Sequence, residues 1–349
     1  MTSNKRPTIV LVGGGSGGHV IPCLVLGKRW LAQCPDGNVV LITDVTRQRQ
    51  WFNDALSDMP TTNFSTSFLS LAKRSGGRIK QMVMLPLMAG QLIAAVVKSF
   101  FVLRKLKPEK IISTGGFVSL PVCVAAWLQS YPIELYELNA EPGLAVMFLA
   151  RFATTIMLPF SITHPKLPAR KCTTYDYPLR YSTADRDDSS FNKHEFLQTI
   201  GFATNRTTLL ILGGSQGSVS LNKTLKDFFV TMHDASQKVQ VIHQTGEYDA
   251  AGWQEFYRAR NIPAHTFAYQ QSLKNFYRAA DLVITRAGAG TLFELLFFGK
   301  HSIVVPLITK TTAHQRENAL GIARLKPELF TVVHELAEVP KTLQSKLMA

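Results

Sequence analysis

The sequence predicts an α/β fold made of two doubly wound domains, each with a parallel sheet. Two observations predict it. Short apolar runs typical of buried strands alternate with longer helical patterns along the chain. The succession of apolar strand, glycine-rich turn and helix also occurs twice, first at 8–18 and again from 207. With 349 residues the chain has room for two domains, because one domain commonly takes about 100–200 residues.

In the first half, the apolar run TIVLV at 8–12 predicts a strand buried on both faces. A helical pattern follows from about Pro22 to Gln33, and a crossover helix is expected over 91–103. Further strands are predicted at 39–43, 110–114 and 133–136. Because strands separated by helices form βαβ units, these elements predict one parallel sheet.

A polar stretch rich in proline, between 159 and 205, interrupts this rhythm. We therefore place the connection around 160–180, between a first domain of residues 1–162 and a second of residues 163–349. We expect residues 182–195 to form a solvated loop. Asp185 and Asp187 match a metal-binding DxD pattern, but such common residues in a polar loop favour solvated charge. The strand pattern resumes after 205, with strands predicted at 207–212, 239–244, 281–286 and 302–306.

The composition describes a folded, basic protein. Apolar residues make up 46% and charged residues 18% of the chain, which excludes a disordered protein. The net charge of +14 favours an anionic partner, such as nucleic acid, an anionic membrane surface or a phosphorylated substrate. The four cysteines lack CxxC spacing, so we expect free thiols in a reducing cytoplasm. The first residues lack the apolar core of a signal peptide.

The first glycine-rich turn runs from Gly13 to Gly18 and leads into a helix whose positive end can bind anions. Together with Asp44 after the next strand, it satisfies the GxGxxG pattern of dinucleotide-binding proteins. On this motif alone, nicotinamide or flavin binding and a purely structural turn both remain open. His19 follows the turn, where it either serves in catalysis or caps its helix.

The second half favours a nucleoside diphosphate. A glycine-rich turn at 213–217 offers backbone N–H donors for phosphate, and Ser215 adds a hydroxyl. A further strand–glycine–helix junction carries Glu294, whose carboxylate can accept two hydrogen bonds from a ribose diol. Alternatively, Glu294 is an ordinary carboxylate favoured by the helix dipole. Gln315 and Asn318 share a helix face and either bind ligand or are solvated.

Six segments, in order, resemble the signature segments of the MurG family. They are GGGSGGHVIP at 13–22, STGGFVSLP at 113–121, YELN at 136–139, LGGSQG at 212–217, RAGAGTLFE at 286–294 and HQRENA at 314–319. The resemblance covers roughly residues 7–325. MurG is the membrane-associated enzyme that adds N-acetylglucosamine to lipid I in peptidoglycan synthesis.

This resemblance implies a GT-B glycosyltransferase, with two Rossmann-like domains facing a cleft. It implies that the second domain binds UDP-N-acetylglucosamine, that the first binds the lipid acceptor, and that His19 is the catalytic base. It implies no metal and no other cofactor. The implied substrate-binding residues are Ser16, Gly17, Gly18, Asn139, Arg180, Ser215, Gln270, Ala289, Gly290, Thr291, Leu292, Phe293, Glu294, Gln315 and Asn318.

The chain also departs from the family pattern. Ser16 replaces the usual threonine and keeps a hydroxyl, whereas Leu138 replaces an amide and Phe117 replaces a tyrosine. We expect the last segment, residues 326–349, to pack back towards the first domain.

The segment 73–110 combines basic clusters with an apolar run. Lys73, Arg74, Arg78 and Lys80 precede the run, and Arg104, Lys105, Lys107 and Lys110 follow it. The run is short and interrupted, so we expect no transmembrane helix. The segment is either a crossover helix that is buried on the sheet or a surface of the protein that binds anionic lipid. A lipid-linked acceptor favours peripheral association with the cytoplasmic face of the cell membrane.

The sequence therefore predicts an inverting transfer of N-acetylglucosamine from its UDP donor to the 4-hydroxyl of lipid I, which gives lipid II. His19 would remove the acceptor proton, and N–H groups of the glycine turns would stabilise the departing UDP without a metal. Alternatives are a UDP-N-acetylglucosamine 2-epimerase, an NAD-dependent oxidoreductase and a non-catalytic UDP-sugar-binding scaffold. Expected partners are the donor, lipid I, an anionic membrane surface and other cell-wall and division proteins, but no nucleic acid.

Overall fold

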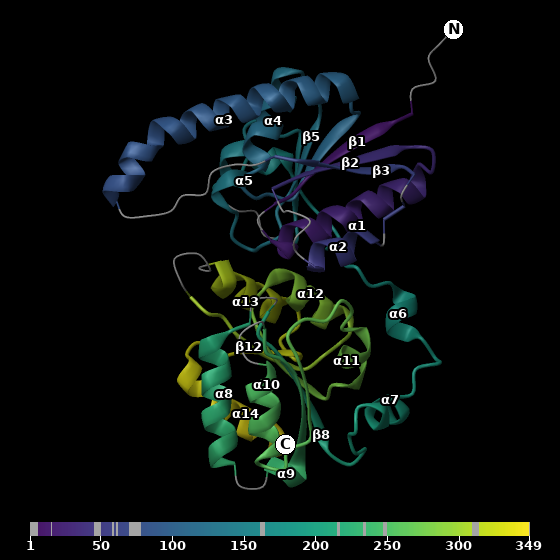
Figure 1. The fold of residues 1–349 in the computed structure, drawn as a ribbon, viewed down its shortest axis with the longest axis vertical. Coiled ribbons are helices and arrows are strands. Elements are labelled where there is room, and N and C mark those ends of the chain that lie inside the picture. Colours follow the sequence, from purple (N-terminus) through teal and green to yellow (C-terminus); the bar gives the residue numbers. More distant parts are fainter. Residues whose placement is uncertain are drawn as a thin grey trace. The chain divides into compact units, whose positions relative to one another are not determined.

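The computed structural model describes residues 6–14, 16–44, 50–57, 59–60, 62–69, 78–160, 165–214, 217–232, 235–246, 250–308 and 314–348. The chain forms two compact units, Met1–Arg180 and Tyr181–Ala349. Each unit has one parallel sheet with helices on both of its faces (Figure 1). The predicted α/β class, with two doubly wound domains, is confirmed.

The first unit contains a seven-stranded parallel sheet with the order β3-β2-β1-β4-β5-β6-β7. Its strands are β1 (Thr8–Val12), β2 (Asn38–Thr43), β3 (Phe64–Phe68), β4 (Lys110–Ser113), β5 (Ile133–Tyr136), β6 (Thr155–Leu158) and β7 (Cys172–Thr174). The strand order reverses between β1 and β4. In open α/β sheets, ligands bind outside the carboxyl ends of the strands at such a reversal.

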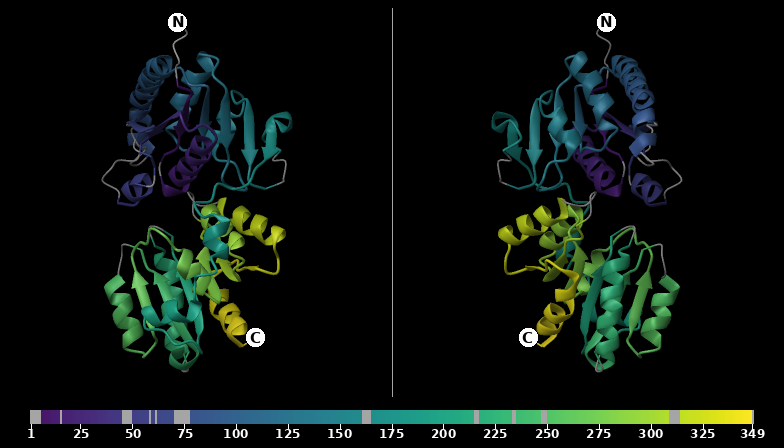
Figure 2. Two further views of the ribbon diagram at one scale, coloured as in Figure 1. Left: turned by 90° about the vertical axis from the view of Figure 1, so that its right-hand side faces the viewer. Right: turned by 90° about the vertical axis from the view of Figure 1, so that its left-hand side faces the viewer.

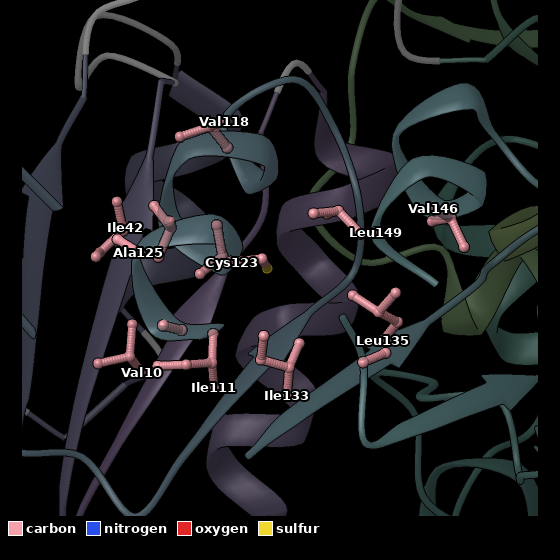
Figure 3. Packing of buried hydrophobic residues seen from close by; sticks show 14 of the residues in the cluster. Val10, Ile42, Ile111, Val118, Cys123, Ala125, Ile133, Leu135, Val146 and Leu149 are labelled. Atoms are coloured by element: carbon pink, nitrogen blue, oxygen red, sulfur yellow. The ribbon is translucent and has the colours of Figure 1, made fainter. Parts of the chain in front are cut away.

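Helices cover both faces of this sheet (Figure 2). They are α1 (Gly17–Gln33), α2 (Gln50–Ser57), α3 (Arg78–Leu106), α4 (Ser119–Leu128) and α5 (Leu144–Leu149), with a 3₁₀ turn, η1, at Ala169–Lys171. Successive strand residues point to opposite faces. Val10 and Ile111 therefore belong to a core with residues of α4 and α5 (Figure 3) and of α3. Ile9 and Leu11 pack with residues of α1 and α2.

The first unit extends further along the chain than the sequence predicts. β7 pairs in parallel with β6, with Cys172 opposite Ile156, and the unit ends at Arg180. The expected boundary at residue 162 lies between these two strands. Proline-rich composition identified the connecting region, but hydrogen bonding to the edge of the sheet determines which unit the segment joins.

The second unit contains a six-stranded parallel sheet with the order β10-β9-β8-β11-β12-β13. Its strands are β8 (Thr207–Leu212), β9 (Val239–Gln244), β10 (Ala264–Phe267), β11 (Leu282–Arg286), β12 (Ser302–Val305) and β13 (Phe330–Val332). Its helices are α6 (Thr183–Asp187), α7 (Lys193–Thr199), α8 (Val219–Thr231), α9 (Ala235–Lys238), α10 (Ala250–Arg258), α11 (Lys274–Ala279), α12 (Ala289–Phe297), α13 (His314–Leu325) and α14 (Val339–Met348), with a 3₁₀ turn, η2, at Leu336–Glu338. The order reverses between β8 and β11.

The C-terminal helix α14 packs within its own unit. Val339 and Leu343 have no exposed surface and belong to the core formed by α8, α10 and the sheet. We expected residues 326–349 to pack back towards the first domain. Val339 and Leu343 are instead buried in the second unit, because they pack on apolar residues of α8, α10 and the sheet.

Residues 182–195 are not a simple solvated loop, because they contain α6 and the start of α7. Ser182 and Asp185 form a reciprocal capping box at the start of α6, and Asn192 caps α7. Such local side-chain bonds to the backbone stabilise short helices despite a polar composition. Asp185 also pairs with Lys274 at 3.1 Å, and Asp187 pairs with the neighbouring Arg186. Both aspartates of the DxD pattern are thus bonded to basic side chains.

His243 is a fully buried histidine in β9. Its Nε2 lies 3.3 Å from the amide oxygen of Asn222, and its Nδ1 lies 3.1 Å from the hydroxyl of Tyr257. Because an amide oxygen only accepts, Nε2 carries the proton and Nδ1 accepts from Tyr257. Burial lowers the pKa of His243 to about 3, so the imidazole is neutral in the folded protein.

We expect the second unit to lose stability as the pH falls from about 6.5 towards 3. The unfolded chain protonates this histidine below about pH 6.5, whereas the folded chain does not. The free energy of unfolding should fall by up to about 1.4 kcal/mol per pH unit in this window. Urea denaturation at several pH values measures the slope, which His243→Gln should flatten. Equal slopes in parent and variant would exclude His243 as the cause.

Candidate active site

The carboxyl ends of β1, β4 and β5 carry the signature segments of the first unit. These strands are neighbours in the sheet, so the turns that follow them lie along one edge. The turn after β1 leads into α1, the turn after β4 leads into α4, and the turn after β5 leads into α5. The sheet therefore brings together residues that are more than a hundred positions apart in the sequence.

Gly14 of the first glycine turn and Gly116 after β4 are closely packed. A Cβ on Gly14 would lie 2.3 Å from a carboxylate oxygen of Asp44, and one on Gly116, at φ +85°, would lie 2.8 Å from the Gly14 carbonyl oxygen. Ser16 is the N-cap of α1, and its side chain forms no capping hydrogen bond. Ser16 and Gly18 are exposed and Gly17 is partly buried. The start of α1 thus presents backbone N–H groups at the strand edge.

His19, in the first turn of α1, is held by Thr114, which directly follows β4. Its Nδ1 lies 2.7 Å from the carbonyl oxygen of Thr114. A carbonyl oxygen only accepts, so Nδ1 carries the proton and the neutral imidazole has its lone pair on Nε2. This is the tautomer that a general base at Nε2 requires.

The hydroxyl of Thr114 makes a second link to His19. It donates to the backbone carbonyl oxygen of His19 at 2.8 Å, and the thiol of Cys23 lies 3.1 Å from the same hydroxyl oxygen. Because the hydroxyl proton is already donated, the thiol is the donor to it. Burial raises the pKa of Cys23 to about 12, which keeps the thiol protonated. Nothing in the sequence pattern singled out Thr114 as a partner of His19.

The turn after β5 is organised by Glu137, a buried carboxylate that sequence reasoning did not select. Its Oε1 accepts from the backbone N–H groups of Leu138 and Asn139, both at 2.8 Å, and from the Asn139 amide at 3.2 Å. Its Oε2 accepts from the Gly143 N–H at 3.0 Å. Burial raises the pKa of Glu137, while these bonds act to lower it. The carboxylate fixes the orientation of the Asn139 side chain.

The first unit also contains Arg180, a predicted substrate-binding residue, and two residues that depart from the family pattern, Leu138 and Phe117. Arg180 is partly buried and lies in the connection after β7, as the last residue of the unit. The side chain of Leu138 is buried, whereas Phe117, in the turn before α4, is 46% exposed.

In the second unit, the carboxyl ends of β8, β11 and β12 lie side by side. The glycine turn after β8 is closely packed, because a Cβ on Gly217, at φ +75°, would lie 2.5 Å from the carbonyl oxygen of Thr245. Ser218 caps α8 by accepting from the Leu221 N–H. Ser215, the predicted phosphate contact, lies outside the described residues.

The junction after β11 presents the start of α12. Gly288 is the N-cap and makes no side-chain bond, so the N–H groups of Ala289, Gly290 and Thr291 begin the helix. Leu292 is fully buried and Phe293 nearly so, so these two residues contribute packing rather than an exposed side chain. Glu294 is 8% exposed, and the hydroxyl of Tyr277 donates to its Oε2 at 2.7 Å. The carboxylate lies beyond the first turn of α12, where the helix dipole favours it little, so the alternative of an ordinary carboxylate favoured by the dipole is not supported.

Gln315 and Asn318 are buried, which excludes the solvated alternative. The Gln315 Oε1 accepts from the Leu307 N–H at 3.3 Å, and the Asn318 amide donates to the Ala287 carbonyl oxygen at 3.2 Å. These bonds attach α13 to the ends of β12 and β11. Gln270 follows β10 and is exposed. Within the described ranges, His, Cys, Asp and Glu side chains form no group of three that could hold a metal ion.

Comparison with known proteins identifies the family. Residues 9–158 match the glycosyltransferase family 28 N-terminal domain, and residues 208–349 match the glycosyltransferase family 28 C-terminal domain. A UDP-N-acetylglucosamine–N-acetylmuramyl-(pentapeptide) pyrophosphoryl-undecaprenol N-acetylglucosamine transferase of Thermus thermophilus is 31% identical, over 86% of this chain and 80% of the relative. The protein of the same name from Salinibacter ruber is 30% identical, over 92% of this chain and 83% of the relative.

A solved structure has the same fold. The crystal structure of Acinetobacter baumannii MurG matches with a TM-score of 0.69 and 22% identity, and the match covers 98% of this chain and 91% of that chain. The expected GT-B fold is confirmed. The chain therefore belongs to glycosyltransferase family 28 and, within it, to the MurG family.

Proposed function

We propose that the protein transfers N-acetylglucosamine from UDP-N-acetylglucosamine to the 4-hydroxyl of lipid-linked N-acetylmuramoyl-peptide, converting lipid I into lipid II. The observation that carries this proposal is the similarity, over 86% of the chain, to a relative whose printed name states this transfer. Polar residues near the carboxyl ends of the two sheets also support it. In the first unit, His19 is hydrogen-bonded to Thr114, and in the second unit the buried carboxylate of Glu294 lies near the start of α12.

The second unit binds the donor in this proposal. The N–H groups of the glycine turn after β8 and of the first turn of α12 bind the diphosphate. Glu294 accepts hydrogen bonds from the ribose hydroxyls, with its carboxylate oriented by Tyr277. Gln315 and Gln270 serve sugar and base recognition, and Asn318 supports this site from within the fold through its bond to Ala287.

The first unit binds the acceptor, and His19 acts as the general base. As the acceptor oxygen attacks the anomeric carbon, its proton moves to Nε2 of His19. The bond from that carbon to the β-phosphate oxygen breaks, and UDP leaves with the electron pair. Attack from the opposite face inverts the anomeric configuration. Thr114 positions the imidazole through the hydrogen bond at Nδ1.

Incubation with UDP-N-acetylglucosamine and a short-chain lipid I analogue tests the proposal. We expect UDP release that depends on the acceptor, together with a disaccharide product. UDP release at the same rate without acceptor, or epimerisation of the donor at C2, would contradict the proposal and favour an epimerase.

The proposed location is the cytoplasmic face of the membrane, where the protein is peripherally bound. In the described part of the chain, every helix is too short or too polar to cross a membrane. Helix α3 exposes an apolar stripe, Ile93, Val97 and Phe101, with exposed fractions of 65%, 50% and 64%. Their four-residue spacing places them on one helix face. Three exposed basic residues on the same helix, Lys98, Arg104 and Lys105, supply charge for anionic lipid.

Replacing Lys98, Arg104 and Lys105 with Gln should weaken binding to anionic vesicles by roughly 1 kcal/mol for each charge near the surface. Activity on a short-chain soluble acceptor should change little. Vesicle sedimentation measures the binding, and Val230→Ser with Leu325→Ser serves as the control, because both are exposed apolar residues of the second unit. Vesicle binding equal to that of the parent would place the membrane-binding surface elsewhere.

Of the basic cluster predicted earlier, Lys73 and Arg74 lie outside the described residues, as do the side chains of Arg78 and Lys80.

A further inference from the structure

Arg286 is the last residue of β11, at the edge where the binding segments of the second unit meet. It lies opposite Val305 of β12, and the preceding residue, Thr285, lies opposite Leu212 of β8. The chain therefore continues on either side of it from the ends of β8 and β12, and the described residues that follow these ends are 213–214 and 306–308. In the next few residues the chain turns at Gly288 and begins α12.

One atom of the Arg286 guanidinium, Nε, is buried without a hydrogen-bond partner in the part of the chain that the structure describes. Nε is a single N–H donor, so this leaves one buried donor at the carboxyl end of β11 without an acceptor. Burial lowers the pKa of Arg286, which expresses the cost of keeping its charge away from water. Buried polar groups of folded proteins almost always have a partner, so an orphaned donor at a binding edge indicates a ligand.

A second basic side chain, His314, interacts electrostatically with Arg286. His314, the first residue of α13, has its pKa lowered by burial and by the positive charge of Arg286. The two basic groups are thus close enough to interact. An arrangement of this kind suits an anion, and the N–H groups at the start of α12 favour the same sign of charge.

We infer that Arg286 binds the diphosphate of the nucleotide donor and stabilises the charge that UDP acquires as it leaves. The planar guanidinium offers several N–H donors in a fixed arrangement that matches phosphate oxygens. The glycine turns supply partial charges from the backbone, whereas Arg286 supplies a full positive charge at the same edge. This inference rests on the proposed function, because it requires that the second unit binds UDP.

Calorimetric titration with uridine, UMP and UDP tests the inference. We expect Arg286→Gln to weaken UDP binding by about tenfold to a hundredfold, the range for a hydrogen bond to a charged group. Uridine binding should be unchanged, and Arg286→Lys should fall between the parent and the Gln variant for UDP. Arg324→Gln is the matched control, because Arg324 is exposed on α13, and it should behave like the parent.

Thermal unfolding distinguishes a ligand-binding role of Arg286 from a structural one, because the two roles predict opposite changes in Tm when the residue is replaced. Without nucleotide, Arg286→Met should raise Tm, because it removes a buried donor that has no partner. It should also reduce the rise in Tm that UDP causes in the parent. A lower Tm without nucleotide, or equal losses of uridine and UDP affinity, would assign Arg286 a structural role and overturn the inference.

The outcomes separate this inference from the proposed function. A parent protein that does not bind UDP contradicts the proposed function itself. A parent that binds UDP, together with an Arg286→Gln variant that binds it equally well, contradicts only the inference. If the Gln variant does not fold, the Lys variant carries the test: it keeps the charge but not the planar donors, so UDP binding should weaken while uridine binding is kept.

Discussion

The His19→Ala variant is expected to lose at least about a hundredfold in kcat while binding UDP as tightly as the parent. His19 lies at the strand edge of the first unit, whereas the residues proposed to bind UDP lie in the second. Its Nδ1–H donates to the Thr114 carbonyl oxygen at 2.7 Å, so the neutral ring can accept a proton at Nε2. Steady-state kinetics with a soluble acceptor, together with calorimetric titration of UDP, measure both quantities.

A second variant separates a base from a structural anchor. The side-chain amide of His19→Asn can still donate to the Thr114 carbonyl oxygen but cannot accept a proton at neutral pH. We expect it to be as inactive as His19→Ala. His194→Ala removes an exposed histidine of α7 and should retain full activity. An active His19→Asn enzyme would show that the residue only caps and anchors α1.

The pH profile gives an independent measure of the same role. A general base works only when deprotonated, so kcat should fall on the acid side as the base becomes protonated. This acid limb should be present in the parent and absent from the residual activity of His19→Ala. An unchanged acid limb in the variant would assign the titration to another group.

The Glu294→Ala variant is expected to bind UDP-N-acetylglucosamine more weakly by about 1.5–3 kcal/mol, or roughly tenfold to a hundredfold in Kd. The carboxylate is proposed to accept hydrogen bonds from the ribose hydroxyls, and its burial makes each such bond costly to lose. Calorimetric titration of the folded variant measures the change. Glu255→Ala, which removes an exposed carboxylate of α10, is the control and should leave the affinity unchanged.

Two further measurements locate the effect of Glu294. With 2′-deoxy-UDP, which lacks one ribose hydroxyl, the difference between parent and Glu294→Ala should become smaller. Tyr277→Phe removes the hydroxyl that donates to Oε2 and keeps the carboxylate, so it should cost less affinity than Glu294→Ala. If the loss is the same for UDP and its 2′-deoxy analogue, the carboxylate does not contact the 2′-hydroxyl.

Much of the fold could be predicted from local patterns. The runs at 8–12 and 209–212 are strands because continuous apolar residues suit a sheet that is covered on both faces. The strand at 239–244 is also fully buried, although it carries three polar residues. The glycine turns could be predicted as well, because glycine suits the left-handed backbone and the close approach that Gly217 makes to the Thr245 carbonyl oxygen. Residues 182–195 could not, because capping by Ser182 and Asn192 depends on local bonds that composition does not reveal.

By itself, the sequence determined the two α/β units, the glycine-rich strand ends and the candidate histidine and glutamate, because each follows from a short pattern of neighbouring residues. Only the tertiary structure determined what holds and surrounds them. Thr114 meets His19 across 95 positions of the chain, Tyr277 reaches Glu294 from a different helix, and Arg286 is left with a buried Nε that has no partner among the described residues. The parallel sheet is the physical reason: it aligns the carboxyl ends of strands that are distant in the sequence, so the contacts at this edge depend on strand order rather than on sequence spacing.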